Sequence, residues 1–248
     1  MRSITIGHPL IQLESVDSTN VYASRLIKKD DVAEGTVILA VYQSQGKGQG
    51  GNQWISEAGR NLLLSLVLKP DFLLAERQFY LSMCVSNAVR DFIASMAHPA
   101  QIKWPNDILL RGKKISGLLI ENSILEQYIK TAVVGIGINI NQHEFPPEVP
   151  DPISLSIATG KEYDLTDLLS SLIKSLEINI SRLYHEAFGE IKTKYLNNLL
   201  RLNEWAVYAD SSGSFEGRIA DVADSGELMV VLRNHEMRYY GFKEIKFS

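Results

Sequence analysis

The chain has 248 residues, of which 45% are hydrophobic and 22% charged, as in an ordinary globular protein with room for one large domain and a small appendage. Its formal net charge of −4 gives no basic field of the kind that recruits nucleic acid. The single cysteine, Cys84, excludes an intramolecular disulfide and a cysteine-cluster zinc site, and its apolar helical surroundings predict a small core residue.

Hydrophobic periodicity predicts five elements in the first hundred residues. They are a strand at 11–14, a helix at 19–29, apolar strands at 35–42 and 61–69, and a long amphipathic helix at 75–96. Asp17 and Ser18 are candidate N-caps of the first helix. The strand at 35–42 runs directly into a segment rich in glycine.

The next hundred residues begin with short strands and end in helices. Strands are expected at 102–104, 108–110, 114–121 and 128–141, with a hairpin turn at 111–113. Residues 142–152 hold four prolines and are expected to form a loop. Helices are expected at 164–184 and 187–202.

The pattern of hydrophobic and polar residues changes at about Asn203. Four short runs with β propensity, at 205–208, 215–222, 228–232 and 237–242, are joined by polar turns. Their regular spacing predicts a small β-barrel, which at this size should pack on the main domain. We therefore expect a main domain at 1–202 and a C-terminal domain at 203–248.

The segment from Gln43 to Trp54 is the strongest indication of function. Four glycines fall within Gly46–Gly51, around the single cation Lys47. Such density sacrifices backbone entropy, and in return it lets backbone N–H groups approach an anion. The mobile lysine adds a charge for a phosphate or a carboxylate. For the glycines taken alone, a flexible surface turn is the alternative.

Two further segments carry charged side chains. Residues 103–108 place Lys103, Asn106 and Asp107 around a proline-rigidified turn, and Asp107 is suited to hold a hard cation through oxygen. An Asn-Asp turn that caps a strand end is the alternative. Lys114 begins an otherwise apolar strand, where a solvated edge charge is the alternative.

Glycines also interrupt the predicted strand at 128–141. Gly135 and Gly137 stand where a glycine commonly marks a close approach of the backbone to another group. Asn139 and Asn141 follow on one side of the same strand. The alternative role for these two amides is to satisfy the backbone of a neighbouring loop.

Together these segments suit the activation of a carboxylate by a nucleotide. Holding a carboxylate against the α-phosphate of ATP requires cations, a divalent metal and backbone donors in a site with little water. Lys47, Lys114, Asp107 and the backbone of Gly46–Gly51 offer this set. Neither glycine pattern matches GxxxxGK[ST] or a strand-following GxGxxG, which argues against P-loop and Rossmann sites.

In this order, the segments resemble those of the biotin–protein ligases. The family pattern is Ser-Thr-Asn, a Gly-Arg-Gly-rich loop ending in Trp, Lys-Trp-Pro-Asn-Asp, Lys-x-x-Gly-x-Leu and Gly-x-Gly-x-Asn. It occurs here at 18–20, 46–54, 103–107, 114–119 and 135–139. The resemblance implies an α+β fold, in which a class II aminoacyl-tRNA synthetase-like catalytic domain with a mixed sheet and flanking helices precedes a small C-terminal SH3-like β-barrel.

The resemblance also implies a reaction and the residues that perform it. Biotin and Mg-ATP give biotinyl-5′-AMP and pyrophosphate, and a lysine of a biotin carboxyl carrier domain then attacks the mixed anhydride. Lys114 and Lys47 are the implied catalytic residues, and Asp107 is the implied Mg²⁺ ligand. The implied biotin contacts are Ser18, Thr19, Asn20, Gln43, Lys47, Gly48, Gln49, Lys114, Gly117 and Gly135. The implied ATP contacts are Gln49, Asn52, Trp54, Asn106, Asp107, Lys114 and Asn139.

The chain departs from the family pattern in two places that bear on the site. Where well-known members carry several arginines, residues 46–52 keep only the charge of Lys47, so we expect weaker retention of the adenylate. No tryptophan occurs in 142–152 to stack on the adenine. Two other functions stay open: a lipoate ligase or octanoyl transferase with the same core fold, and a non-catalytic ligand sensor or repressor remnant.

Three features of the sequence bear on localisation and on partners. Residues 1–13 lack the basic start and apolar core of a signal peptide, and no stretch reaches the ~18 apolar residues of a membrane span. A cytoplasmic protein without a membrane partner is therefore expected. The start of the chain leaves no room for the winged-helix domain of the repressor members, so no DNA binding is expected, and a homodimer is left open.

Overall fold

The computed structural model describes residues 4–247, which form a seven-stranded sheet and a separate five-stranded sheet. The strand order of the larger sheet is β1-β2-β3-β7-β6-β5-β4. Its β1–β2 pair is parallel and its other neighbours are antiparallel, so the sheet is mixed as predicted. The strands are β1 (Leu10–Val16), β2 (Val37–Gln43), β3 (Leu62–Leu68), β4 (Ala100–Lys103), β5 (Asp107–Leu110), β6 (Lys113–Leu125) and β7 (Tyr128–Ile138).

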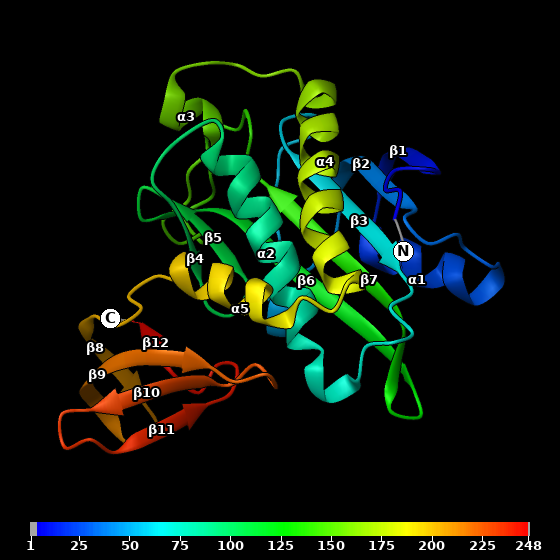
Figure 1. Cartoon of the computed structure of the whole chain (residues 1–248). Coiled ribbons are helices and arrows are strands. Elements are labelled where there is room, and N and C mark those ends of the chain that lie inside the picture. Colours follow the sequence, from blue (N-terminus) through cyan, green and yellow to red (C-terminus); the bar gives the residue numbers. More distant parts are fainter. Residues whose placement is uncertain (1–3, 248) are drawn as a thin grey trace.

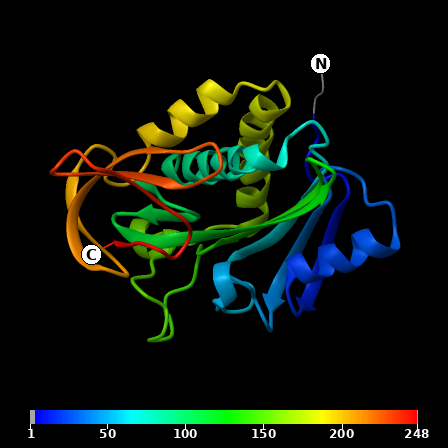
Figure 2. The ribbon, with the colours of Figure 1, turned by 90° about the horizontal axis from the view of Figure 1, so that it is seen from below.

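Helices cover both faces of this sheet, and Figure 2 shows α2, α4 and α5 together on one side and α1 on the other. Strand β3 is therefore buried along its whole length: Leu66 packs in the core beneath α2 and α4, whereas Val67 packs with Ala23 of α1. None of the helices within residues 4–247 has the length and apolarity that crossing a bilayer requires. The helices are α1 (Thr19–Lys29), α2 (Phe79–Ala94), α3 (Leu155–Thr159), α4 (Leu165–Tyr184) and α5 (Phe188–Asn197), with 3-10 turns η1 (Gln49–Gly51) and η2 (Ala75–Arg77).

Some predicted helix boundaries differ from those of the structure. The helix expected at 187–202 ends at Asn197, because the next residues bond to β4: Asn198 accepts from the Ile102 N–H and Leu200 donates to the Ile102 carbonyl, both at 2.8 Å. The helix expected at 75–96 divides into η2 and α2. The short helix α3 was not predicted, and the Ser154 hydroxyl caps it by accepting from the Ile157 N–H at 3.2 Å.

The second sheet lies at one end of the molecule (Figure 1) and is antiparallel throughout, in the order β11-β10-β9-β8-β12. It encloses a small core that includes Tyr208, Ile219 and Val230. The four predicted runs appear as β8 to β11, and β12 was not predicted. The strands are β8 (Trp205–Asp210), β9 (Gly213–Val222), β10 (Leu228–Leu232), β11 (Met237–Tyr240) and β12 (Lys246–Phe247).

Specific bonds fix the small sheet to the main domain. The Trp104 indole N–H donates to the Gly226 carbonyl at 2.9 Å, and the Tyr80 hydroxyl donates to Asp224 at the same distance. Gly226 packs so closely on Phe79 that a Cβ there would lie 2.6 Å from the Phe79 ring. Trp104 is thus an anchor between the two parts of the chain, and it holds the C-terminal segment beside β5 and β6.

Candidate active site

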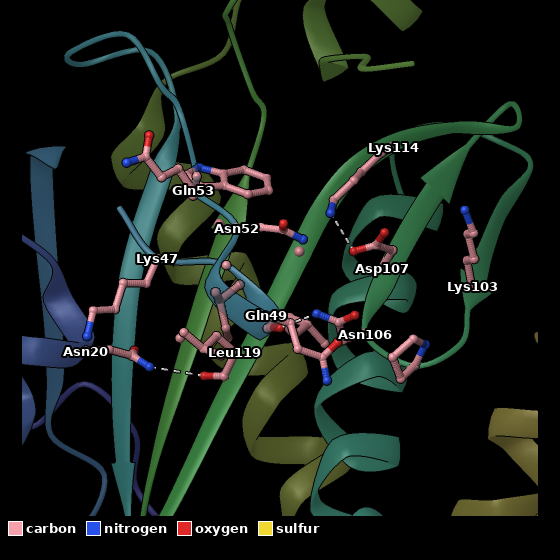
Figure 3. Close-up of a pocket in the computed structure, with 18 of the residues that line it drawn as sticks. Asn20, Lys47, Gln49, Asn52, Gln53, Lys103, Asn106, Asp107, Lys114 and Leu119 are labelled. Atoms are coloured by element: carbon pink, nitrogen blue, oxygen red, sulfur yellow. Dashed lines mark hydrogen bonds and ion pairs between the residues drawn. The ribbon is translucent and has the colours of Figure 1, made fainter. Parts of the chain in front are cut away.

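A cavity of about 480 Å³ lies on the face of the larger sheet that carries α1. Its walls are the start of α1, the glycine-rich segment, the start of β5, the middle of β6 and β7, and the last residues of the C-terminal sheet. Figure 3 shows Lys47 and Lys114 reaching the cavity from opposite sides, with Asn20 and Asp107 also at its ends. The cavity is large enough for an elongated small molecule.

Three glycines form the floor of this cavity. Gly117 of β6 pairs directly with Gly137 of β7, and Gly135 lies two residues away on the same face. A Cβ on Gly135 would lie 2.5 Å from Asn20 Oδ1, and a Cβ on Gly137 would lie 2.5 Å from Cε2 of Trp54. The close approach expected from glycines within a strand is therefore made by side chains of α1 and of the glycine-rich segment.

The predicted Ser18-Thr19-Asn20 triplet forms a buried polar cluster at the start of α1. Thr19 donates to Gln43 Oε1 from its backbone N–H at 2.7 Å and from its hydroxyl at 3.0 Å. The Asn20 amide donates to Glu121 Oε2 at 2.8 Å and to the Leu119 carbonyl at 3.2 Å. All three members of the triplet are buried and line the cavity, where they can hydrogen-bond a polar ring.

Ser65 of β3 belongs to the same cluster and was missed by the sequence analysis. Its hydroxyl oxygen lies 2.6 Å from Asn20 Oδ1 and 2.8 Å from the Thr19 hydroxyl, and the residue is fully buried. The available signal was a lone hydroxyl in the apolar run of β3. Because a buried hydroxyl needs a partner, that position pointed to a polar neighbour on the α1 face.

A lysine and a carboxylate meet at the other end of the cavity. Lys114 Nζ lies 2.6 Å from Asp107 Oδ1, and the two side chains are 31% and 21% exposed. The backbone of Lys114 is held by the loop before α3, since its N–H donates to the Asp151 carbonyl at 2.8 Å. The neighbouring Asn106 amide donates to the Leu118 carbonyl at 2.6 Å, which fixes the turn between β4 and β5 against β6.

The glycine-rich segment closes on itself as a hairpin. Lys47 bridges to Gln53, the Gly48 N–H donates to the Asn52 carbonyl at 2.7 Å, and the turn between them is η1. The hairpin directs the Trp54 indole into the cavity, over Gly137 and 5.9 Å from Lys114 Nζ. The Trp54 Nε1 atom is buried without a hydrogen-bond partner among the described residues.

The charged side chains that line the cavity are mostly positive. Asp107 is the one carboxylate among the described lining residues, whereas five lysines line the cavity: Lys47, Lys103, Lys114, Lys243 and Lys246. Within residues 4–247 no three histidine, cysteine or acidic side chains gather as a metal site. Such a cavity favours a polyanion. No site role was predicted for Lys103, Lys243 or Lys246.

The fold brings together every predicted site residue except Asn139. That residue is 4% exposed, its side-chain amide donates to the Ile153 carbonyl at 3.2 Å, and it does not line the cavity. Its position fits the alternative considered for it, an amide that satisfies loop backbone. The expected ATP contact of Asn139 therefore finds no support in this geometry.

The chain matches a family model and individual proteins of that family. The model of the Biotin/lipoate A/B protein ligase family matches residues 12–139. A biotin--[acetyl-CoA-carboxylase] ligase of Paracoccus denitrificans is 32% identical over 230 residues, which are 88% of this chain and 92% of that protein. The bifunctional ligase/repressor BirA of Bacillus subtilis is 29% identical over 233 residues, 93% of this chain and 71% of that protein.

Solved structures agree over nearly the whole chain. The biotin protein ligase from Aquifex aeolicus in complex with biotin and ATP matches with a TM-score of 0.76 and 30% identity, covering 96% of this chain and 99% of that one. The apo structure of the same enzyme matches with a TM-score of 0.74 and 27% identity, covering 96% and 98%. The expected fold, a mixed-sheet domain followed by a small antiparallel sheet, is confirmed.

Proposed function

This chain belongs to the biotin/lipoate A/B protein ligase family, and from that premise we propose that it is an ATP-dependent biotin–protein ligase. One observation carries the proposal: a single cavity joins a buried cluster of hydroxyl and amide groups at one end to the Lys114–Asp107 pair at the other. Biotin has the matching polarity, with a ureido ring at one end and a carboxylate at the other. A length of apolar and glycine-lined floor separates the two ends.

The polar cluster is the proposed ureido site. Ser18, Thr19 and Asn20 offer hydroxyl and amide groups, and those of Thr19 and Asn20 are already oriented by Gln43 and Ser65. Such preorganisation lowers the entropy cost of binding. Gly117 and Gly135 keep the floor low enough for the ring, and Lys47, Gly48 and Gln49 close the cavity from the hairpin side.

The first chemical step takes place at the Lys114 end. A carboxylate oxygen of biotin attacks the α-phosphorus of ATP, the bond from that phosphorus to the bridging oxygen breaks, and pyrophosphate leaves. Lys114 offsets the charge that passes from the carboxylate to the phosphate, and Lys47 assists from the opposite wall. Gln49, Asn52, Trp54 and Asn106 line the remaining space for the nucleotide.

Magnesium fits this end of the cavity. Mg²⁺ is commonly held by one or two carboxylates together with substrate phosphates and water, and Asp107 is the carboxylate present. When bound, the ion would neutralise phosphate charge. Asp107 also holds Lys114 in place, so its carboxylate links the position of the lysine to that of the metal.

The second step is transfer to a protein lysine. The uncharged amine of an acceptor lysine, on a biotin carboxyl carrier domain, attacks the carbonyl carbon of biotinyl-5′-AMP. The bond from carbon to the AMP oxygen breaks, AMP leaves, and the amine nitrogen loses a proton as the amide forms. The cavity provides a site with restricted water, which protects the mixed anhydride from hydrolysis.

Mass analysis of the adenylate tests the proposal. The protein is incubated with Mg-ATP and either biotin, lipoic acid or octanoic acid, and products are measured with and without a carboxyl carrier domain. Of the three acids, we expect only biotin to give an adenylate, biotinyl-5′-AMP. When the carrier domain is added, we expect a biotinylated lysine. Binding of biotin without release of pyrophosphate would instead identify a sensor, and an adenylate of lipoic or octanoic acid would identify the related ligases.

A further inference from the structure

Glu121 of β6 is an exposed carboxylate beside the buried polar cluster, and no site role was predicted for it. Its Oε2 atom accepts a hydrogen bond from the Asn20 amide at 2.8 Å. Within residues 4–247 no cationic side chain forms an ion pair with Glu121. Glu121 does not line the cavity, whereas Asn20 does. Glu121 can therefore act on a ligand only through Asn20.

The orientation of the Asn20 amide is fixed by the groups around it. An ionised carboxylate and a carbonyl can only accept hydrogen bonds, so Glu121 Oε2 and the Leu119 carbonyl must both face the amide nitrogen (Figure 3 shows the bond to Leu119). The amide oxygen then points the other way, to the Ser65 hydroxyl at 2.6 Å. It lies over the cavity floor, where a Cβ on Gly135 would be 2.5 Å from it. Asn20 thus offers the cavity an acceptor and no donor.

Glu121 is the stronger of the two groups that hold the amide nitrogen. Its bond to Asn20 is charge-assisted and shorter than the bond from Asn20 to the Leu119 carbonyl, at 2.8 Å against 3.2 Å. The Ser65 hydroxyl on the other side does not select an orientation by itself, because a hydroxyl can donate or accept. Without Glu121, the Asn20 amide is therefore much freer to turn over.

The orientation of Asn20 bears on which acids the polar cluster accepts. A ureido ring has two N–H donors, and one of them can pair with the free lone pair of the Asn20 oxygen. The dithiolane ring of lipoic acid and the alkyl end of octanoic acid have no donor. A site built to accept a hydrogen bond from a ring N–H discriminates against ligands that lack this group. A turned amide would present N–H groups to the N–H groups of the ureido ring.

We propose that Glu121 is a positioning residue that determines specificity. By holding the Asn20 nitrogen, it keeps the amide oxygen turned to the ring of the bound acid and so favours biotin over acids without ring donors. The inference rests on the proposed ligase function. It places a determinant of substrate choice outside the cavity, on a carboxylate that does not touch the substrate.

Titration calorimetry with biotin and with lipoic acid, without ATP, tests this assignment. The variants are Glu121→Ala, Glu121→Gln and Glu121→Lys, with Glu14→Ala as a control at an exposed glutamate of β1 that does not line the cavity. Glutamine keeps an oxygen that can accept from Asn20, whereas lysine offers only donors and would draw the Asn20 oxygen toward itself. We expect the Kd for biotin to stay at the wild-type value in Glu121→Gln and Glu14→Ala. It should rise about tenfold in Glu121→Ala, and further in Glu121→Lys.

The direction of the change separates a hydrogen bond from a general effect of charge. Biotin is an anion, so loss of a carboxylate or gain of an ammonium would strengthen its binding if Glu121 acted by charge alone. We expect the opposite order, with the Kd for lipoic acid unchanged throughout. The KM for biotin should rise with its Kd, while kcat and the KM for ATP stay constant, because Lys114 lies at the other end of the cavity.

Three results would overturn the inference. They are an equal Kd for biotin in wild type, Glu121→Ala and Glu121→Lys, a loss of affinity in Glu121→Gln as large as that in Glu121→Ala, and a melting temperature of Glu121→Ala far below that of Glu14→Ala. The last result would assign Glu121 a structural role, whereas contacts of exposed charges add little to stability. If wild type binds no biotin, the proposed function is overturned as well. A wild type that binds biotin alongside variants that match it overturns the inference alone.

Discussion

Lys114 Nζ and Asp107 Oδ1 lie 2.6 Å apart, and the two residues come from neighbouring strands of a hairpin. Both side chains are partly exposed, and ion pairs of this kind add little to stability. In the proposed mechanism the pair therefore matters chiefly for chemistry, because Asp107 holds the ammonium where a carboxylate and a phosphate would meet.

We expect Lys114→Ala to abolish adenylate formation while leaving the fold intact. Removal of a preorganised charge contact commonly costs about 3–4 kcal/mol in the transition state, which corresponds to a rate loss of two to three orders of magnitude. The measurement is single-turnover release of pyrophosphate. Lys113→Ala is the matched control, since Lys113 is the exposed neighbour on the same strand and does not line the cavity. Near-normal turnover in Lys114→Ala would remove this lysine from the mechanism.

A methyl group on the cavity floor should block biotin. In Gly135→Ala the new Cβ would lie 2.5 Å from Asn20 Oδ1, so Asn20 must move away from Ser65 and Glu121. We expect the affinity for biotin to fall at least tenfold, with a loss of stability of about 1–3 kcal/mol from overpacking. Titration calorimetry and thermal unfolding measure the two effects.

Gly189→Ala is the matched control for that variant, because a Cβ at Gly189 meets nothing within 4 Å. It should leave the affinity for biotin unchanged, and in helix α5 it should slightly raise stability. Equal biotin affinity in Gly135→Ala and wild type would show that Asn20 is not a biotin contact.

Ser65→Ala tests the residue that sequence patterns did not reveal. The substitution leaves Asn20 Oδ1 and the Thr19 hydroxyl without their buried partner, at a cost of about 1–3 kcal/mol in the free energy of unfolding. Biotin affinity should fall as well, because the Asn20 amide keeps its bonds to Leu119 and Glu121 but loses the one that fixes its oxygen. Ser170→Ala, at an exposed serine of α4, is the control for denaturant unfolding. A stability change no larger than that of the control would contradict the role given to Ser65.

Cys84 should be unreactive in the folded protein. It is buried in α2, and burial raises the pKa of its thiol to about 12. The raised pKa means that the neutral thiol persists far above pH 8, and only the thiolate reacts with alkylating reagents. We expect labelling by iodoacetamide at pH 8 to follow the rate of unfolding and to become fast in denaturant. Fast labelling without denaturant would mean that α2 opens locally.

Much of the fold followed from the sequence because its signals are local. The helix at Thr19–Lys29 was predicted with the bounds that the structure shows: Ser18 is at the N-cap position, although no side chain caps the helix, and a lysine pair lies in its last turn. The C-terminal boundary of α5 was not predicted, because it is set by hydrogen bonds to β4 that hydrophobic periodicity does not indicate. The short helix α3 was not predicted either, since it is only about one turn long and follows a proline-rich loop.

The candidate site likewise contains residues that the sequence indicated and residues that it did not. The glycines, Ser18–Asn20, Asp107 and Lys114 could be singled out from the sequence, because spacing and residue type indicate the chemistry of each segment. Ser65 carried only a weak signal, a lone hydroxyl in an apolar strand, because its partner Asn20 is distant in the chain and adjacent in space. Asn139 was assigned to ATP from its motif, yet its amide is turned to the Ile153 carbonyl.

The sequence by itself determined the order of elements, the family and the chemical groups available to the site, since these depend on residue type and spacing along the chain. Only the tertiary structure decided which groups share a cavity. It brought Lys243 and Lys246 to the same cavity as a hairpin almost two hundred residues earlier, because Trp104 and Phe79 dock the C-terminal sheet against the main domain. Packing between distant segments has no signature in either segment alone, and that packing sets the charge of this cavity.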